Sequence, residues 1–387
     1  MAAATISRQN TKQVQQSGSD PAIQVLSPAR HRFLFYRGRI ALYSLLRALK
    51  IGAGDEVIVQ AYTCWEAVQP ILQVGATPVF CDTEPFKFNM DPKALVRTLS
   101  KATKAVIIQH TFGIPAKLDS LMPLLKERGL FAIEDCCHVC SSEYNGLPVG
   151  SFGDAAFYSY AHEKPISGGL GGAVVLNSQA HAAAFQSLYE ASAAPSTAEE
   201  LWAAFRIAAK VIFPAEIVVT VRDYVRGDRI RTKSPERWPD FECKRHLPKI
   251  AAFWVNHLLA RTAKITKRKL RTINKLDQHI AALGLRHPAV PEQRGVVLWR
   301  YPLLTRNKPE LLKRARQCAI RIVDWGSVPF QWEGQLNHNH KFASQTFPNA
   351  LELAETTATI PIGFGLSGSY INKVVRFLSR MSAEGNA

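Results

Sequence analysis

The chain has 387 residues, of which 47% are hydrophobic and 20% are charged, and its formal net charge at pH 7 is +17. This composition is ordinary for a soluble globular protein, and no run of apolar residues is long enough to indicate a membrane span. The positive charge favours anionic partners. Because zinc-finger spacing, RNP-like aromatics and basic-region heptads are absent, we expect no nucleic-acid partner.

The N-terminal segment is polar and lacks the apolar core of a secretory signal, which predicts a disordered lead-in over residues 1–30. The seven cysteines are odd in number and scattered along the chain. That usage is typical of reduced thiols, so we expect a cytoplasmic protein.

From residue 34 to about residue 175, short apolar runs alternate with helical patterns. Uniformly apolar strands separated by helices indicate a parallel sheet that is covered on both faces. The expected strands are Glu56–Val59, Thr77–Cys81, Ala105–Gln109, Leu130–Ile133, Ala155–Tyr160 and Ala173–Leu176. Ligands of such sheets bind at the carboxyl ends of the strands, which is where His110 and Asp135 fall.

The second half of the chain has a less regular pattern. The stretch 199–212 is amphipathic and predicts a helix that faces the core or a partner, with a membrane-surface helix as the less favoured alternative. A long helix is expected over 248–283, then strand, helix and strand over 296–324, and helices over 347–356 and 369–381. We therefore predict a large α/β domain over 31–247, with a helical insertion around 180–240. A linking helix and a small C-terminal α+β domain follow over 248–387.

Residues 134–140 read EDCCHVC, which resembles a metal or redox centre. A structural zinc site needs a second pair of ligands, and no such pair follows, so we expect no metal. Packing beside a buried strand explains the thiols better. Asp135 is different, because a carboxylate at a strand end in a dry crevice needs a cation. That cation is an arginine, a metal or a protonated cofactor ring, unless Asp135 caps a helix.

Lys164 follows a predicted strand and precedes a glycine-rich run, in the stretch SYAHEKPISGGLGG. A lysine held in that way is placed to form a Schiff base, and the glycines let the backbone pass close to a bulky ligand. Ser159 is placed to bind a phosphate. An acid that holds a pyridinium and a lysine that forms an imine are the two requirements of pyridoxal phosphate chemistry.

With these motifs the chain resembles the DegT/StrS family of fold-type-I sugar aminotransferases. The resemblance is close over about residues 36–176 and looser in the C-terminal unit. Its blocks occur in the family's order at Gly38–Leu42, Gly52–Gln60, Gly75–Asp82, Ile133–His138, Gly146–Ser159, Ser159–Gly172, Phe347–Ala354 and Ile360–Leu366.

The resemblance implies a large, mostly parallel α/β/α domain, a smaller α+β domain and a role for each matched residue. Lys164 matches the lysine that binds pyridoxal 5'-phosphate and moves the substrate proton. Asp135 matches the carboxylate at the pyridine nitrogen, and His138 stands near the phenolic oxygen of the ring. Ser159 matches the phosphate-binding hydroxyl, beside the backbone of Gly38 and Arg39.

The chain departs from the family pattern at three places. The aromatic residue that stacks on the cofactor ring falls on Cys64, so either Trp65 or Tyr62 replaces it or the ring stacks on a smaller side chain. The asparagine that reaches the phosphate across the dimer interface falls on Cys243, although Arg245 fits the arginine two residues on. The segment 180–240 is longer than the family pattern.

Together, these features predict an aminotransferase that moves an amino group, by resemblance from glutamate, to a keto group of a nucleotide-linked sugar. Surface polysaccharide or secondary-metabolite biosynthesis is the expected setting, and a homodimer is the expected assembly. The alternatives are a sugar dehydratase, an enzyme with a carrier-linked acceptor at a membrane surface, and a regulatory or scaffold paralogue. Lys164 argues against the dehydratase, in which histidine replaces the lysine.

Overall fold

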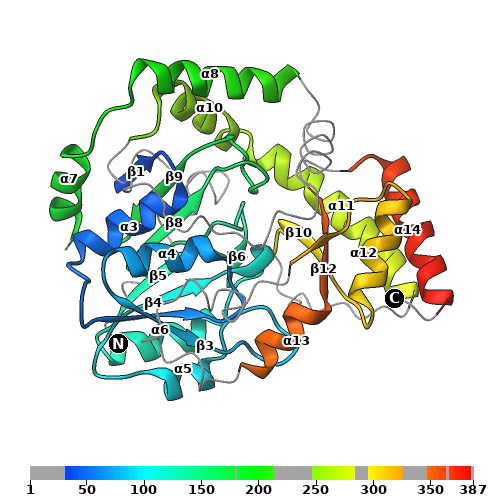
Figure 1. The fold of residues 1–387 in the computed structure, drawn as a ribbon, viewed down its shortest axis with the longest axis horizontal. Coiled ribbons are helices and arrows are strands. Elements are labelled where there is room, and N and C mark those ends of the chain that lie inside the picture. Colours follow the sequence, from blue (N-terminus) through cyan, green and yellow to red (C-terminus); the bar gives the residue numbers. More distant parts are fainter. Residues whose placement is uncertain are drawn as a thin grey trace.

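A seven-stranded sheet organises the first half of the chain, with the strand order β1-β9-β8-β5-β4-β2-β3 (Figure 1). Strands β2, β3, β4, β5 and β8 run parallel, whereas β9 and β1 are antiparallel to their neighbours. The strands are β1 His31–Phe35, β2 Glu56–Gln60, β3 Thr77–Cys81, β4 Thr103–Gln109, β5 Phe131–Asp135, β8 Ala155–Ser159 and β9 Gly172–Leu176. The predicted mostly parallel sheet is therefore confirmed.

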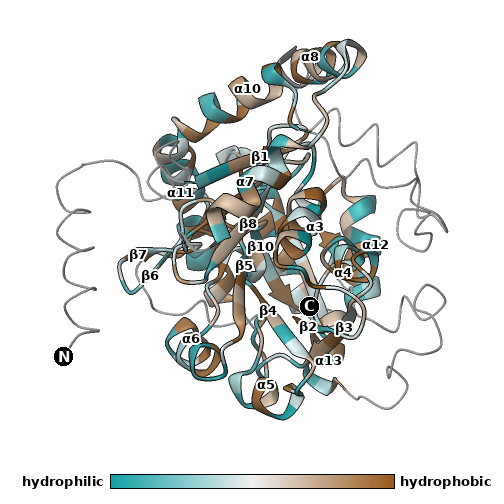
Figure 2. Ribbon diagram, turned by 90° about the vertical axis from the view of Figure 1, so that its left-hand side faces the viewer, coloured by the Kyte–Doolittle hydropathy of each residue, from teal (hydrophilic) through white to brown (hydrophobic). Residues whose placement is uncertain are grey.

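Both faces of the sheet are buried, which explains why its strands are uniformly apolar. In β2, Val57 and Val59 pack into one hydrophobic core and Ile58 packs into another. The strands β4 and β5 are mainly brown in Figure 2. The covering helices include α3 Gly38–Ala48, α4 Trp65–Gln73, α5 Pro92–Thr98, α6 Leu118–Glu127 and α7 Ala182–Glu190. A hairpin of two short antiparallel strands, β6 Glu143–Tyr144 and β7 Leu147–Pro148, follows β5.

A smaller sheet of three antiparallel strands, in the order β10-β12-β11, lies in the C-terminal unit. This unit shares the core that contains Val57, because Tyr301 and Leu353 belong to the same cluster. Its elements are β10 Arg300–Leu304, α12 Lys308–Gln317, β11 Val323–Asp324, α13 Pro348–Thr356, β12 Thr357–Pro361 and α14 Gly368–Ala383. The central strand β12 has no counterpart among the predicted elements.

One expectation for the helices needs correction, and another is narrowed to one of its two alternatives. The helix expected over 248–283 is two helices, α10 Lys249–Leu259 and α11 Thr262–Ala282, separated at Ala260 and Arg261. Helix α8 (Thr197–Ile212) packs on α10, but Leu201 and Phe205 are 67% and 62% exposed. Leu201 and Phe205 therefore do not face the core of the chain, and the predicted alternative, contact of this stripe with a partner, stays a prediction.

The computed structural model describes residues 31–178, 181–212, 246–283, 295–325, 347–362 and 366–384. The lead-in over residues 1–30, Cys243, Arg245 and part of the predicted insertion lie outside these residues. The predicted domain boundaries at 247 and 248 stay a prediction. No helix within the described ranges has the length and apolar character that a membrane crossing requires.

Candidate active site

The carboxyl ends of β5 and β8 bring the predicted acid and lysine segments together. Asp135 is the last residue of β5, and Ser159 is the last residue of β8. The two strands are parallel neighbours in which Asp135 pairs with Phe157. Lys164 follows β8 in a turn, where its backbone N–H donates to the carbonyl of Ala161 at 3.2 Å. This is the edge at which open α/β sheets bind ligands.

Asp135 is a buried carboxylate, only 5% exposed. Burial raises its pKa, and the backbone N–H of Cys137 and the ammonium of Lys164 oppose that rise. The Cys137 N–H donates to Oδ1 at 2.9 Å. A protonated ring nitrogen next to this carboxylate would supply the positive charge that its burial demands.

Lys164 lies close enough to Asp135 and to two thiols to change their titration. Its positive charge lowers the pKa of Cys64 and of Cys137, while burial of each thiol raises that pKa more strongly. For Cys64 the result is a pKa of about 12. Both cysteines are therefore protonated at neutral pH, and neither is a ready nucleophile.

His138 is held as a neutral ring. The backbone N–H of Phe112 donates to Nδ1 at 3.3 Å, which places the ring proton on Nε2. Burial, followed by the charges of Lys164 and Arg300, lowers the pKa of His138 well below its usual value. The ring can thus donate a hydrogen bond through Nε2, as the expected position beside a phenolic oxygen requires.

Two tryptophan side chains pack against the ring of His138. The sequence patterns did not indicate these contacts. Trp299 stacks on His138 with ring centroids 4.1 Å apart, and Trp325 meets the same ring edge-on at 5.4 Å. The ammonium of Lys164 lies 4.9 Å from the centroid of Trp299. Trp299 and Trp325 come from the C-terminal unit and belong to no motif of the N-terminal half, so only the fold brings them here.

A close backbone approach forms a cradle at the start of α3. A Cβ atom on Gly38 would lie 2.9 Å from the Cβ of Ser159 and 3.3 Å from its hydroxyl oxygen. The residue before Gly38 makes no side-chain cap, and Arg39 is half-buried in the first turn of the helix. Backbone N–H groups at a helix start suit a phosphate, and the Ser159 hydroxyl lies beside them.

The acidic and thiol-rich run EDCCHVC is held together by hydrogen bonds. Both oxygens of the buried Glu134 are occupied, since Oε1 accepts from the N–H groups of Phe152 and Gly153 and Oε2 accepts from the N–H of Gly150. The Nε2 atom of His110 lies 3.1 Å from Oε2. His110, Glu134 and Cys136 lie close enough to hold an ion, but the carboxylate already has its partners.

The residues that the structure brings together fit pyridoxal 5'-phosphate. The buried carboxylate of Asp135 suits a protonated pyridine ring, Lys164 suits its aldehyde, and the cradle at Gly38 suits its phosphate. Of the remaining predicted site residues, Trp65 is the half-buried first residue of α4, where Cys64 is the N-cap. Arg245 lies outside the described residues.

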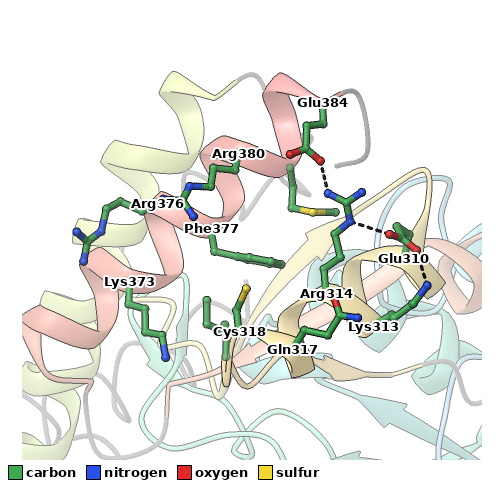
Figure 3. A pocket seen from close by; sticks show the side chains of 12 residues that line it. Glu310, Lys313, Arg314, Gln317, Cys318, Lys373, Arg376, Phe377, Arg380 and Glu384 are labelled. Carbon is green, nitrogen blue, oxygen red and sulfur yellow. Dashed lines mark hydrogen bonds and ion pairs between the residues drawn. The ribbon is translucent and has the colours of Figure 1, made fainter.

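A pocket of about 760 Å³ lies elsewhere, between α12 and α14 (Figure 3). Arg314 is paired there with Glu310 and Glu384, and Phe377 contributes an apolar floor. None of the predicted site residues lines it, so it is separate from the site around Lys164.

Comparison with known proteins shows the family of the chain. The model of the DegT/DnrJ/EryC1/StrS aminotransferase family matches residues 29–379. The chain belongs to this family. The resemblance seen in its motifs is therefore confirmed, and the cofactor of the family is pyridoxal phosphate.

Individual relatives are similar to parts of the chain. A GDP-perosamine synthase of Vibrio cholerae is 39% identical over 149 residues, which are 38% of this chain and 41% of that protein. A UDP-N-acetyl-3-dehydro-alpha-D-glucosamine 3-aminotransferase of Acidithiobacillus ferrooxidans is 40% identical over 39% of this chain and 41% of its own length. The chain thus matches less than half of the length of these curated relatives.

The similarity in fold to solved structures extends over more of the chain than the sequence similarity to the curated relatives does. The crystal structure of the aminotransferase TlmJ from Streptoalloteichus hindustanus superposes with a TM-score of 0.73 and 20% identity. That match covers 95% of this chain and 91% of the other. The predicted fold type I is thereby confirmed.

Proposed function

We propose that this protein is a pyridoxal-phosphate-dependent aminotransferase that moves an amino group from glutamate to a keto group of a nucleotide-linked sugar. The family match supports the reaction class, and the names of the two relatives point to nucleotide-linked sugars. The observation that carries the proposal is the buried carboxylate of Asp135 at the end of β5, with Lys164 following the neighbouring strand β8 at the same edge of the sheet.

Each residue of the site then has a defined task. When bound, pyridoxal phosphate supplies an aldehyde for the donor's amine and a protonated ring that withdraws electrons. Asp135 would keep that ring protonated. Lys164 would take the proton from the carbon that carries the amine and return it to the product. The neutral His138 would orient the ring through Nε2, and Gly38 and Ser159 would hold the phosphate.

An absorbance spectrum of the purified protein tests this proposal. We expect a band near the visible edge in the wild type that changes when glutamate is added. Lys164→Ala should lack the band, whereas Lys126→Ala, an exposed lysine on α6, should keep it. Absence of any band after addition of the cofactor would contradict the proposal. A band that glutamate leaves unchanged would favour dehydration, another donor or a regulatory role.

An exposed apolar face on α8 and α10 supports the expected homodimer. The face consists of Leu201, Trp202, Phe205, Ile250 and Phe253. Arg206 on α8 donates to the carbonyl of Gly169 in the loop after Lys164, so this helix contacts the lysine loop. Large exposed apolar side chains that gather on one face usually mark an association surface.

Measurements of the oligomeric state and of lipid binding show whether this face binds a second copy of the chain or a membrane surface. We expect sedimentation equilibrium to give twice the chain mass, and Trp202→Glu with Phe205→Glu to give the monomer. Binding to anionic liposomes without dimerisation would favour membrane-surface association and a carrier-linked acceptor instead.

We also propose a cytoplasmic location, which the free thiols of the six cysteines in the described residues support.

A further inference from the structure

Glu163, the residue before Lys164, has an unusual backbone conformation. Its φ is 71°, in the left-handed region that favours glycine. A non-glycine residue there costs about 1–2 kcal/mol, so neighbouring contacts must hold it in place. One such contact lies within the loop, where the N–H of Glu163 donates to Ser167 at 3.3 Å.

The C-terminal unit holds Glu163 at three atoms. Arg300 donates to Oε2 and Arg321 donates to Oε1, each at 2.9 Å. The indole N–H of Trp299 donates to the backbone carbonyl of Glu163 at 2.5 Å. We call this set of contacts the Glu163 clamp. It joins the loop that carries Lys164 to the first residue of β10 and to the segment before β11.

The clamp also brings two cations and a carboxylate together near the site. The side chain of Arg300 is 5% exposed, and its guanidinium lies 4.6 Å from the centroid of the Trp299 ring. The ammonium of Lys164 lies 4.9 Å from the same centroid. Two cations thus share one indole ring, and the carboxylate of Glu163 offsets the charge of Arg300 directly.

We propose that Glu163 is a positioning residue that clamps the Lys164 loop to the C-terminal unit and sets the electrostatic environment of the lysine. Because both carboxylate oxygens are bound by arginines, Glu163 itself is not placed to accept a proton from a substrate. This role rests on the proposed function in so far as it concerns the reaction of Lys164. The mechanical part of the clamp does not depend on that function.

Glu163→Gln tests the clamp, because it removes the charge and keeps the shape. Glu310→Gln is the matched control, since it breaks another glutamate–arginine pair in the C-terminal unit, with Arg314 at 2.7 Å. In the loaded protein we measure the pH midpoint of the absorbance change of the lysine-bound cofactor and the rate of the half-reaction with glutamate. We expect the Glu163→Gln midpoint to shift and the rate to fall about tenfold or more, with little change in the affinity for glutamate.

Hydrogen exchange of the cofactor-free protein provides a readout that is independent of activity. We expect the amides of residues 163, 164 and 166–168 to exchange about tenfold faster in Glu163→Gln than in the wild type and in Glu310→Gln. Glu163→Asp, which keeps the charge, should restore part of the protection. If Glu163→Gln fails to fold, Arg321→Gln removes one arm of the clamp and leaves the buried pair with Arg300.

The possible results separate the clamp from the proposed function. Exchange and pH midpoint that match the Glu310→Gln control would overturn the clamp, even in an active enzyme. Faster exchange in a protein that shows no cofactor band would keep the clamp and contradict the aminotransferase. Faster exchange with an unchanged midpoint and rate would overturn the role of Glu163 toward Lys164.

Discussion

His138 and Trp299 lie face to face, with ring centroids 4.1 Å apart and planes inclined by 25°. His138 follows β5 of the main sheet, whereas Trp299 directly precedes β10 of the C-terminal unit. Trp299 also donates its backbone N–H to the carbonyl of Phe112 at 2.6 Å. The C-terminal unit therefore forms one wall of the site. The unit of the main sheet contributes Asp135 and Lys164.

Truncation of Trp299 should destabilise the protein. It is 5% exposed, so Trp299→Ala should lower the free energy of unfolding by about 3–5 kcal/mol. Trp299→Phe keeps a ring but loses the indole N–H to Glu163, and should cost about 1–2 kcal/mol. Urea unfolding of the cofactor-free protein measures both. Phe86→Tyr, at an exposed aromatic residue outside the site and the apolar face, should change stability by less than about 0.5 kcal/mol.

The depressed pKa of His138 predicts how its contribution to stability depends on pH. The unfolded chain takes up a proton near pH 6.5, whereas the buried ring resists it, so stability falls as the pH decreases below about 6.5. The loss should approach about 1.4 kcal/mol per pH unit until the folded ring titrates. His138→Gln should remove this part of the slope when unfolding is measured between pH 7.5 and 5. Equal slopes in both proteins would contradict the assignment.

Glu134 should stabilise the fold through its hydrogen bonds, and this stabilisation should not depend on a metal ion. Glu134→Gln replaces one oxygen by an amide that faces N–H donors, and should lower the free energy of unfolding by about 3 kcal/mol. Glu127→Gln, on the exposed side of α6, is the control and should have little effect. Dialysis against a chelator should leave the unfolding midpoint of the wild type unchanged. A lower midpoint after chelation would instead favour an ion between His110, Glu134 and Cys136.

Gly38→Ala should weaken binding of the cofactor. The new methyl group would lie 2.9 Å from the Cβ of Ser159, so the cradle must open by several tenths of an ångström. We expect the dissociation constant for pyridoxal phosphate, measured by fluorescence titration, to rise about tenfold, which corresponds to about 1.4 kcal/mol. Gly52→Ala is the matched control, since its Cβ would meet nothing closer than 3.4 Å. Equal affinities in the two variants would argue against a phosphate at Gly38.

Much of the main sheet was predictable because burial on both faces leaves a clear pattern. Val57, Ile58 and Val59 are apolar in succession since alternate residues enter different cores. The break between α10 and α11 was not predictable, because Ala260 and Arg261 carry no glycine or proline signal. Strand β12 follows α13 directly and lies between the two predicted C-terminal helices, where no strand was predicted.

The site was predictable only where its residues follow one another closely in the chain. Asp135, Ser159 and Lys164 stand at strand ends or just beyond, so the order of strands and helices places them together. Arg300 and Trp299 reach the site through packing of the C-terminal unit, which no local spacing encodes. The φ of Glu163 is likewise set by its contacts, since its own residue type does not favour it.

The cradle at Gly38 is made by segments far apart in the chain. Arg37 forms a bridge with Gly171, and the backbone of Gly172 lies against that of Gly38, so the start of α3 is enclosed only when β8 and β9 have joined the sheet. During synthesis on the ribosome, the first 160 residues therefore cannot hold a phosphate at this helix. The cofactor should bind late, to a sheet that has already assembled, and so cannot guide the folding of the strands that precede Lys164.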